Sequence, residues 1–493
     1  MEKSYKKVLL VFFLVLSIRL FFSFSAPNFT GGESYHNIMQ TEKIVERGVL
    51  SFYGYLADKD NLIVFPPLFY YVLAFFNIFM PLTLVAKIIP NVLASTIVIL
   101  IYIISLEIVQ NKRIALINSF IAGFMPIFFK QTVNTVSIHS LSIPLIFLSL
   151  FALMTLDKYK NSIYLLLISL ILLLFTHPIA LLLIFGLLLY LILIRSMNLK
   201  QSKVELEVIF FSTFIAFWFF LLLFKKAFLE HGFHTIWQNT PSKILTNYFF
   251  DIGILESIYA IGIVPFIFGV YIIYKYILKK RKRHLYLFSG MAIASFLLLW
   301  FKLMTPANSL VILGLSLIVL SSQFYSDFLK FISKTKLHLK KVYTSFLILA
   351  VILTSLFPSI SYAQNEIDNS LTDKEKNALI WIKENTPEKT TILSLYKEGH
   401  LIKAIAERKN FIDQNFLLVK NINQKFEDHE IMYTSKFSTN ALRLLIKYEI
   451  DYIYFSSKTK KTLNIEGMAY VYDECFPLVY DGEIKIYKVE CII

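Results

Sequence analysis

The stretch VLLVFFLVLSIRLFFSF, residues 8–24, is apolar except for Arg19 and two serines. A run of this length after a basic segment fits either a cleaved signal peptide that ends near Ser25 or a retained transmembrane helix. An arginine near the outer end is unusual in the hydrophobic region of a signal peptide. We therefore predict that residues 8–24 stay in the protein as its first membrane span.

The rest of the chain shares this apolar character. Hydrophobic residues make up 56% of its 493 positions, and the mean hydropathy is +0.62. Soluble domains are rarely so apolar, so lipid is the expected solvent for most of the chain. The net charge of +15 would suit nucleic-acid binding if the basic residues shared a solvated face with aromatic rings. They lie instead in short loops between apolar runs, so we expect membrane lipid as a partner and no nucleic acid.

The apolar runs predict a helical bundle in the membrane. A spanning helix needs about 20 apolar residues, and about eleven runs approach this length, several of them at its short limit. The runs are 8–24, 83–106, 114–129, 141–156, 163–175, 179–194, 208–224, 258–278, 285–301, 310–324 and 342–357.

The run 67–80 decides the topology. It is apolar and aromatic but short, and segments of this length are more often interfacial or re-entrant than spanning. If the run 67–80 does not cross the membrane and the N-terminus is cytoplasmic, every strongly basic loop is cytoplasmic. If the run does cross, the basic block 279–283 would lie outside the cell, against the usual distribution of positive charge. We therefore predict a multi-pass protein of the cell membrane with a cytoplasmic N-terminus and an extracytoplasmic C-terminal domain. The basic loops are 112–113, 158–160, 195–203, 279–283 and 330–341.

Two parts follow from this topology. Residues 1–360 form a transmembrane domain with a large first outer loop, 26–82, and a second, 225–253. Residues 361–493 form a soluble domain, in which Thr372 and Glu375 fit a capping box that opens a helix ending at Asn385. Strand-like runs alternate with helical stretches after it, which predicts a small α/β domain. The strands are 391–395, 452–455, 468–472 and 483–489, and the helices are 401–408 and 440–448.

The chain has two cysteines, Cys475 and Cys491, which excludes a cysteine zinc cluster and a disulfide framework. They flank a predicted hairpin turn at Asp481 and Gly482. A strand register centred on that turn does not place them opposite each other, so we expect two unpaired thiols.

A polar motif, Gly31-Gly32-Glu33-Ser34-Tyr35-His36-Asn37, begins the first outer loop, and a helical stretch ending at Gly48 follows it. A carboxylate at the membrane boundary can accept a proton from a substrate or bind a cation. The competing interpretation is that Glu33 only complements the dipole of the helix that it starts. The residues alone favour neither interpretation.

Two further segments are FPPLFYY at 65–71 and WIKENTP at 381–387. With them, the sequence resembles the GT-C superfamily of membrane glycosyltransferases, which includes protein mannosyltransferases, aminoarabinose transferases and oligosaccharyltransferase catalytic subunits. Residues 33–48 resemble the family's first-loop acidic motif and helix, 66–71 its surface aromatic segment, and 86–91 the start of its second span. Residues 381–413, with Gly399-His400, are similar to the start of the extracytoplasmic domain of archaeal oligosaccharyltransferases.

The sequence also departs from the family. The usual first-loop acidic pair is Gly32-Glu33 here, and the second outer loop, 130–139, has no carboxylate. Glu33 is thus the only candidate ligand for the divalent cation, Mg²⁺ or Mn²⁺, that the resemblance implies, and the metal is left unassigned. The acceptor-reading Trp-Trp-Asp-Tyr-Gly motif is also absent, since 395–400 reads LYKEGH. Transfer of N-linked oligosaccharide is therefore not the first expectation.

The resemblance implies transfer of a sugar from a polyprenyl-phosphate donor to a protein, lipid or glycan acceptor on the outer face of the membrane. Glu33 would be the catalytic base, while His36 and Lys302 would stabilise the leaving phosphate and the run 69–79 would line the prenyl chain. Lys302 as a snorkelling side chain and His177 as a turn residue are the structural alternatives. The predicted substrate-binding residues are Tyr35, His36, Pro66, Pro67, Tyr70, His177 and Lys302.

Two other functions stay open at this point. A transporter or flippase also has many spans, but we find no inverted repeat and few charges within the apolar runs. A non-catalytic homologue that acts as a scaffold is the other, and the missing second acid supports it.

Overall fold

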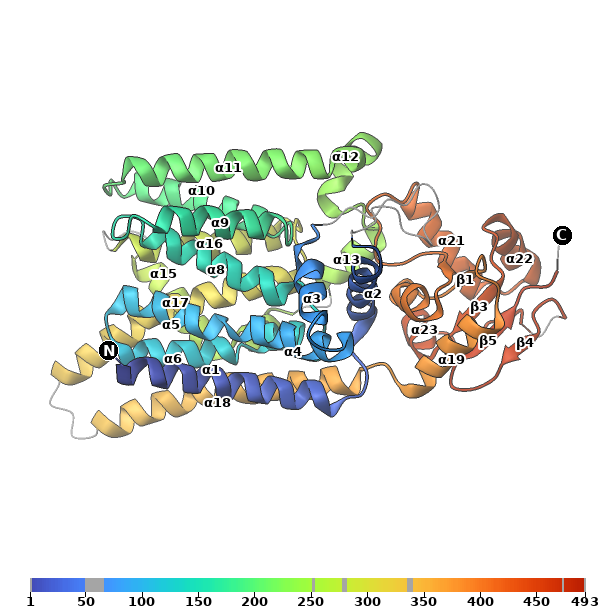
Figure 1. The fold of residues 1–493 in the computed structure, drawn as a ribbon, viewed down its shortest axis with the longest axis horizontal. Coiled ribbons are helices and arrows are strands. Elements are labelled where there is room, and N and C mark those ends of the chain that lie inside the picture. The colour runs from blue at the N-terminus through green and yellow to red at the C-terminus, as the bar shows by residue number, and fades with distance from the viewer. Residues whose placement is uncertain are drawn as a thin grey trace. The chain divides into compact units, whose positions relative to one another are not determined.

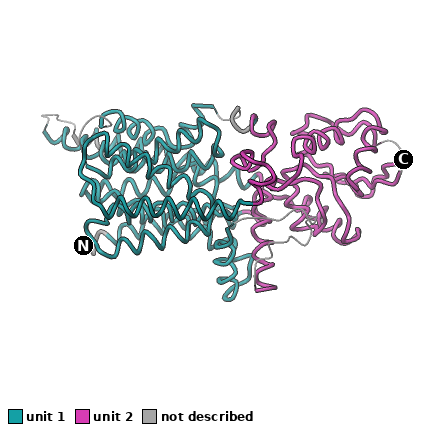
Figure 2. Tube along the Cα trace, turned by 90° about the horizontal axis from the view of Figure 1, so that it is seen from above, with its two compact units in different colours: residues 1–25, 65–225, 247–368 teal, residues 26–64, 226–246, 369–493 magenta. Residues whose placement is uncertain are grey.

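The computed structural model describes residues 2–48, 66–250, 253–276, 282–334, 340–471 and 474–491. Part of the loop predicted to be the first outer one, 49–65, and most of the basic block 279–283 lie outside the described residues. The chain forms two compact units (Figure 2). We call residues 1–25, 65–225 and 247–368 the helical unit, and residues 26–64, 226–246 and 369–493 the mixed unit.

The helical unit is a bundle in which long apolar helices lie side by side (Figure 1). Aliphatic and aromatic side chains make up most of its core, and many small polar residues, mainly serines, are buried among the helices. The helices are α1 (Glu2–Ser25), α3 (Leu68–Asn77), α4 (Leu82–Ser95), α5 (Ile97–Val109), α6 (Lys112–Gly123), α7 (Pro126–Thr132), α8 (His139–Met154), α9 (Ser162–Leu174), α10 (Ala180–Ser196), α11 (Lys203–Leu223), α14 (Ile254–Ile261), α15 (Ile263–Tyr276), α16 (Arg283–Trp300), α17 (Pro306–Lys334) and α18 (Lys340–Asp368).

The chain is a multi-pass membrane protein. Within the described residues, 6 helices are long and apolar enough to cross a bilayer, or up to 8 if two bent pairs are each one span. The three helices α8, α9 and α10 have 16, 13 and 17 residues and fall below that length. At about 1.5 Å per residue such helices are shorter than a typical hydrocarbon core, so the count of eleven stays a prediction.

Proline and glycine explain the two bent pairs. Helices α6 and α7 meet at 47°, and Pro126 occupies the start of α7, where its missing N–H costs no hydrogen bond. Helices α14 and α15 meet at 98°. The bend lies at Gly262, whose φ of +102° is unfavourable for residues with a Cβ.

Polar contacts join helices inside the bundle where a charge is buried. The carboxylate of Glu205 on α11 is buried and accepts a 2.6 Å hydrogen bond from the Tyr190 hydroxyl on α10. The Arg283 guanidinium at the start of α16 forms an ion pair with the same carboxylate. A buried carboxylate needs such partners, so this cluster links three helices at one end of the bundle.

The mixed unit contains a small sheet with helices around it (Figure 1). Its strand order is β2-β1-β3-β5-β4, with β1 parallel to β2 and β3, and β5 antiparallel to β3 and β4. The elements assigned wholly to this unit are α2 (Gly31–Arg47), η1 (Gly232–Trp237), α19 (Asp373–Asn385), β1 (Thr391–Leu393), α20 (Gly399–Leu401), the π-helix η2 (Ile402–Ala406), β2 (Lys409–Asn410), α21 (Ile422–Thr434), α22 (Ser438–Lys447), β3 (Tyr452–Phe455), α23 (Ser457–Leu463), β4 (Leu478–Tyr480) and β5 (Lys485–Lys488). Helices α12 (Lys225–His231) and α13 (Ser242–Phe250) run across the boundaries between the units.

The predicted capping box is confirmed: the Thr372 side chain accepts from the Glu375 backbone, and the Glu375 side chain accepts from the Thr372 backbone. The strand predicted at 468–472 is wrong for its described residues. Met468 lies in irregular backbone and Tyr470 in a turn, and both side chains are buried in the core of the unit. Their apolar alternation reflects burial of a loop, not a strand.

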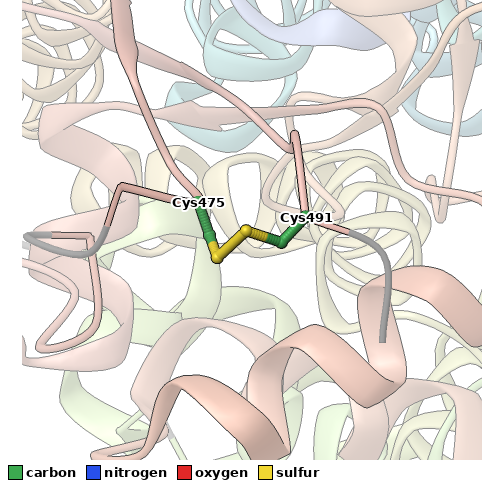
Figure 3. Close-up of a disulfide and its surroundings, with 2 residues drawn as sticks. All are labelled: Cys475 and Cys491. Atoms are coloured by element: carbon green, nitrogen blue, oxygen red, sulfur yellow. A yellow bond between two sulfur atoms is a disulfide. The ribbon is translucent and has the colours of Figure 1, made fainter.

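The expectation of two unpaired thiols is also wrong. Cys475 and Cys491 form a disulfide, with their Cα atoms 4.9 Å apart (Figure 3). The turn between β4 and β5 is wider than the two residues assumed, since β4 ends at Tyr480 and β5 begins at Lys485. The pairing therefore shifts, and the Glu490 N–H donates to the Cys475 carbonyl at 3.0 Å, which brings the cysteines together.

Candidate functional site

Helix α2 carries Glu33 in its first turn. The helix follows an extended Thr30 and ends at Gly48, which adopts a left-handed conformation with φ 73°. Glu33 is exposed to solvent. Desolvation nevertheless raises the pKa of its carboxyl above the ordinary value.

The segment before α2 is fixed to the start of α19. Asn28 donates to the Leu371 carbonyl at 2.9 Å and to the Asp373 carboxylate at 3.0 Å. The Leu371 N–H donates to the Phe29 carbonyl at 3.2 Å, and Thr30 forms a β-bridge with Ser370. These contacts attach the segment before α2 to the C-terminal part of the mixed unit.

Gly32 lets α2 lie directly on α20. A Cβ at Gly32 would meet the His400 Cβ at 3.1 Å and the Lys397 carbonyl oxygen at 3.2 Å. Few real contacts are that short, so a larger residue would push the two helices apart. The Gly31-Gly32-Glu33 motif is thus a packing motif as well as the position of a carboxylate.

A buried polar cluster continues this interface. The rings of His36 and His400 have centroids 4.6 Å apart, and His400 Nδ1 lies 3.9 Å from Asp413 Oδ2. The Lys403 ammonium donates to the same Asp413 oxygen at 2.6 Å. Burial lowers the pKa of both imidazoles, and His400 adds to the effect on His36. Burial alone would raise the pKa of Asp413, but the Lys403 and His400 side chains bring it below its ordinary value.

Tyr35, also on α2, packs against an apolar core that includes Leu379 and Ile382. Its hydroxyl accepts a 3.3 Å hydrogen bond from the Phe29 N–H. Burial raises the pKa of Tyr35 to about 12. The structure thus places Tyr35 and His36 in the packing of α2, next to the exposed Glu33.

The other predicted site residues belong to the helical unit. Pro66 is buried, and Pro67 precedes α3, whose Leu68 N–H donates to the Phe175 carbonyl at 2.8 Å. That bond joins the proline segment to the turn containing His177. Tyr70 is 1% exposed in the first turn of α3.

His177 accepts a 3.0 Å hydrogen bond from the Ile179 N–H, as a turn residue would. Its ring also lies against His139, with centroids 4.9 Å apart. Lys302 is exposed in the turn between α16 and α17, with a left-handed φ of 55°. Among the eight predicted site residues, Glu33, Tyr35 and His36 fall in the mixed unit, and Pro66, Pro67, Tyr70, His177 and Lys302 fall in the helical unit.

The described residues do not offer a ready metal centre. No group of three or more His, Cys, Asp or Glu side chains that could hold a metal ion occurs among them. In the buried cluster, the Asp413 carboxylate already pairs with the Lys403 ammonium. The part of the chain seen here does not fit a tightly held divalent cation, and no chemical step is assigned to one.

Sequence reasoning missed the partners of α2 in the C-terminal region. Gly399-His400 was a point of resemblance, but nothing indicated that it lies against Gly32 and His36. Lys403 and Asp413 gave no local signal. The contact joins residues more than 350 positions apart, and such pairing has no pattern in a single sequence.

The comparisons with known proteins concern both fold and sequence. No protein family model matches the sequence. Dolichyl-phosphooligosaccharide-protein glycotransferase 2 from Archaeoglobus fulgidus is 30% identical over 136 residues, which is 26% of this chain. The match spans about a quarter of that relative, 23% of its length.

Solved structures match over nearly the whole chain. The oligosaccharyltransferase AglB from Archaeoglobus fulgidus, in complex with an inhibitory peptide and a dolichol-phosphate, has a TM-score of 0.64 and 14% identity, over 90% of this chain and 69% of that one. ArnT from Cupriavidus metallidurans, bound to undecaprenyl phosphate, has a TM-score of 0.55 and 10% identity, over 97% of both chains. The mycobacterial arabinofuranosyltransferase AftD has a TM-score of 0.57 and 10% identity, over 98% of this chain and 40% of that one. The chain therefore has the fold of the GT-C membrane glycosyltransferases.

Proposed function

We propose that this protein transfers a sugar from a polyprenyl-phosphate donor to a protein, lipid or glycan acceptor on the outer face of the membrane. The main support is the fold, which three glycosyltransferases share over at least 90% of this chain. Two of them were solved with a polyprenyl-type phosphate, dolichol-phosphate in AglB and undecaprenyl phosphate in ArnT. Neither a transporter nor a flippase occurs among these neighbours.

Glu33 is the proposed catalytic base. An acceptor hydroxyl or amine attacks the anomeric carbon of the sugar, the bond from that carbon to the phosphate oxygen breaks, and the acceptor proton passes to Glu33. The electron pair of the broken bond leaves with the lipid phosphate. A carboxylate with a raised pKa is a stronger base than an ordinary one while it is ionised. Its exposure leaves it open to an acceptor.

The supporting residues have different proposed roles. Lys302 is the proposed cationic contact of the leaving phosphate, and the segment from Pro66 to Tyr70 with His177 is proposed to bound the donor site. The burial of His36 and the partial burial of Tyr35 suit the positioning of α2, and direct substrate contact by either of them stays a prediction.

We propose a topology of eleven crossings. They comprise the six long helices, the two bent pairs, and α8, α9 and α10, with α3 lying at the surface. The extracytoplasmic location proposed for the C-terminal region fits the disulfide Cys475–Cys491, because disulfides persist in oxidising compartments.

Substitution of Glu33 tests the function. Cells that lack the protein would be complemented with wild type, Glu33→Gln or Glu46→Gln, and their surface glycans compared. Glu46 is an exposed carboxylate on the same helix, so its variant is the matched control. We expect Glu33→Gln to reduce product by about 100-fold or more with normal membrane insertion, which is the scale of a lost general base. Full activity of Glu33→Gln would contradict the assigned base, and a wild type without product would favour the scaffold.

Two further experiments address the metal and the topology. We expect the purified protein to keep full activity in EDTA, because among the described residues Glu33 belongs to no group of three or more side chains that could bind a metal ion.

An impermeant thiol reagent applied to intact cells should label Lys374→Cys and spare Lys200→Cys, both exposed positions. Labelling of Lys200→Cys from outside would contradict the eleven-span topology.

A further inference from the structure

Arg19 is the one charged residue inside the apolar part of α1, and it is completely buried in the helical unit. Its Nη1 donates to the Thr132 hydroxyl on α7 at 2.7 Å. The guanidinium carbon lies 5.2 Å from the Phe128 ring centroid and 4.5 Å from that of Phe129. The rings cover faces of the guanidinium, so its edges stay available for hydrogen bonds.

The structure leaves much of this charge uncompensated. Nε and Nη2 of Arg19 have no hydrogen-bond partner among the described residues, and no carboxylate there forms an ion pair with it. An isolated buried charge is expensive, and arginines inside membrane spans usually serve function. Because an arginine does not give up its proton readily, the cost is best offset by an anion that this chain does not supply.

More polar groups lie at the same end of α1. Ser23, one helical turn after Arg19, is buried, and its hydroxyl has no partner within the described residues. Its carbonyl accepts a 2.9 Å hydrogen bond from the Lys87 ammonium on α4. Asn91, one turn further along α4, donates to the Lys87 carbonyl at 2.8 Å. Lys87 and Ser23 thus meet where α1 lies against α4, one helical turn along α1 from Arg19.

Apolar side chains flank these groups. On α1, Phe21 is 69% exposed and Phe24 is 49% exposed, and Leu84 on α4 is 40% exposed. The Lys87 ammonium lies 5.4 Å from the Phe24 ring centroid. In a membrane helix, exposed large apolar residues face lipid. The cluster therefore suits a ligand with an anionic head and an apolar tail.

We propose that Arg19, Ser23 and Lys87 form a binding site for the phosphate of a membrane lipid, and that this lipid is the polyprenyl-phosphate carrier. The Arg19 fork presents Nε and Nη2 to two phosphate oxygens, Ser23 donates its hydroxyl, and Lys87 adds a second positive charge. The carrier assignment rests on the proposed function, but the phosphate site does not. Arg19 and Lys87 are assigned here in addition to Lys302.

Binding to the purified full-length chain in detergent tests the site, with geranyl phosphate as the probe. Calorimetry would give Kd for wild type, Arg19→Met, Arg19→Lys, Ser23→Ala and the control Arg195→Gln, which alters an exposed arginine of α10. We expect Arg19→Met to weaken binding about tenfold or more, as the loss of a charged hydrogen-bond donor does. Arg19→Lys keeps the charge but not the fork, so its Kd should fall between the two. Arg195→Gln should match wild type.

Thermal unfolding without ligand separates binding from structure. Removing an uncompensated buried charge should leave the Tm of Arg19→Met equal to or above that of wild type, while geranyl phosphate should raise the Tm of wild type alone. An unchanged Kd in Arg19→Met would overturn the site. A lower ligand-free Tm with an unchanged Kd would show that Arg19 is structural.

Two competitors identify the source of the phosphate. If neither phosphatidylglycerol nor inorganic phosphate displaces geranyl phosphate, the carrier assignment is supported. Displacement by phosphatidylglycerol, lost in Arg19→Met, would keep the phosphate site and overturn the carrier. Equal binding of inorganic phosphate would overturn the role of the lipid tail. If Arg19-dependent binding persists in a protein that forms no glycan product, the proposed function fails and the site stands.

Discussion

Glu398 makes the stability of the mixed unit depend on pH. It immediately precedes the Gly399-His400 pair against which α2 packs, and it is 2% exposed. Its Oε2 accepts a long hydrogen bond, 3.5 Å, from the Thr459 hydroxyl, and its Oε1 has no partner among the described residues. Burial raises the pKa of Glu398 from 4.5 to about 7. The folded protein therefore holds this proton more tightly than the unfolded chain does.

The sign and size follow from linkage. A carboxyl with a raised folded-state pKa contributes stability that is fully present below its unfolded pKa of 4.5 and is lost as pH rises through about 7. The shift of roughly 2.5 pKa units, 7 minus 4.5, corresponds to about 3 kcal/mol at 1.36 kcal/mol per unit. Most of that loss should occur between about pH 5 and 8. Glu398→Gln keeps the side-chain shape and removes the titration.

Thermal unfolding of the full chain in detergent across this pH range measures the effect. Wild type should lose stability relative to Glu398→Gln as pH rises, and the variant should be the more stable of the two at pH 8. The exposed Glu466→Gln serves as the control, and its difference from wild type should not change with pH. A constant difference between wild type and Glu398→Gln over the whole range would refute the reasoning.

Three further predictions concern how α2 and the sheet are held. Gly32→Ala should destabilise the mixed unit by about 1–3 kcal/mol and reduce product, because a Cβ there crowds α20. Gly467→Ala is the control, since nothing lies within 4 Å of its new Cβ. Equal Tm values for the two variants would contradict the packing of Gly32 on α20. Cys475→Ser should lower the free energy of unfolding by about 2–4 kcal/mol, because it opens a bridge between cysteines 16 positions apart. Reduction of wild type with dithiothreitol should cause the same loss of stability, and no loss in either experiment would contradict the disulfide. Asn28→Ala removes two hydrogen bonds to the start of α19 and should therefore increase hydrogen exchange of the backbone amides in the first turns of α2, measured by mass spectrometry. Unchanged exchange would contradict the role of Asn28 in holding α2.

Local patterns predicted local structure well. The polar stretch ending at Gly48 is a helix with a left-handed glycine cap, and the capping box at Thr372 is formed by both of its hydrogen bonds. The strand at Tyr452–Phe455 has the predicted bounds. Each depends on residues a few positions apart, so its signal survives in a single sequence.

Long-range features were not predictable in the same way. The disulfide depended on the width of one turn, and a change of two residues in that turn altered which side chains face each other. The span count depended on short helices that composition alone does not assign to the membrane. The apposition of His36 and His400 required the fold of the mixed unit.

The position of Glu33 follows from how α2 is held. A carboxylate on a surface loop would be poorly placed for catalysis, because a general base must stay within hydrogen-bond reach of its substrate. Here the loop segment is anchored at Asn28, its helix meets α20 at Gly32, and His36 lies against His400 one turn later. Glu33 lies between the two packing positions and is itself exposed. Any change that loosens this contact should therefore reduce transfer without altering the carboxylate, and Gly32→Ala should act like a weaker form of Glu33→Gln.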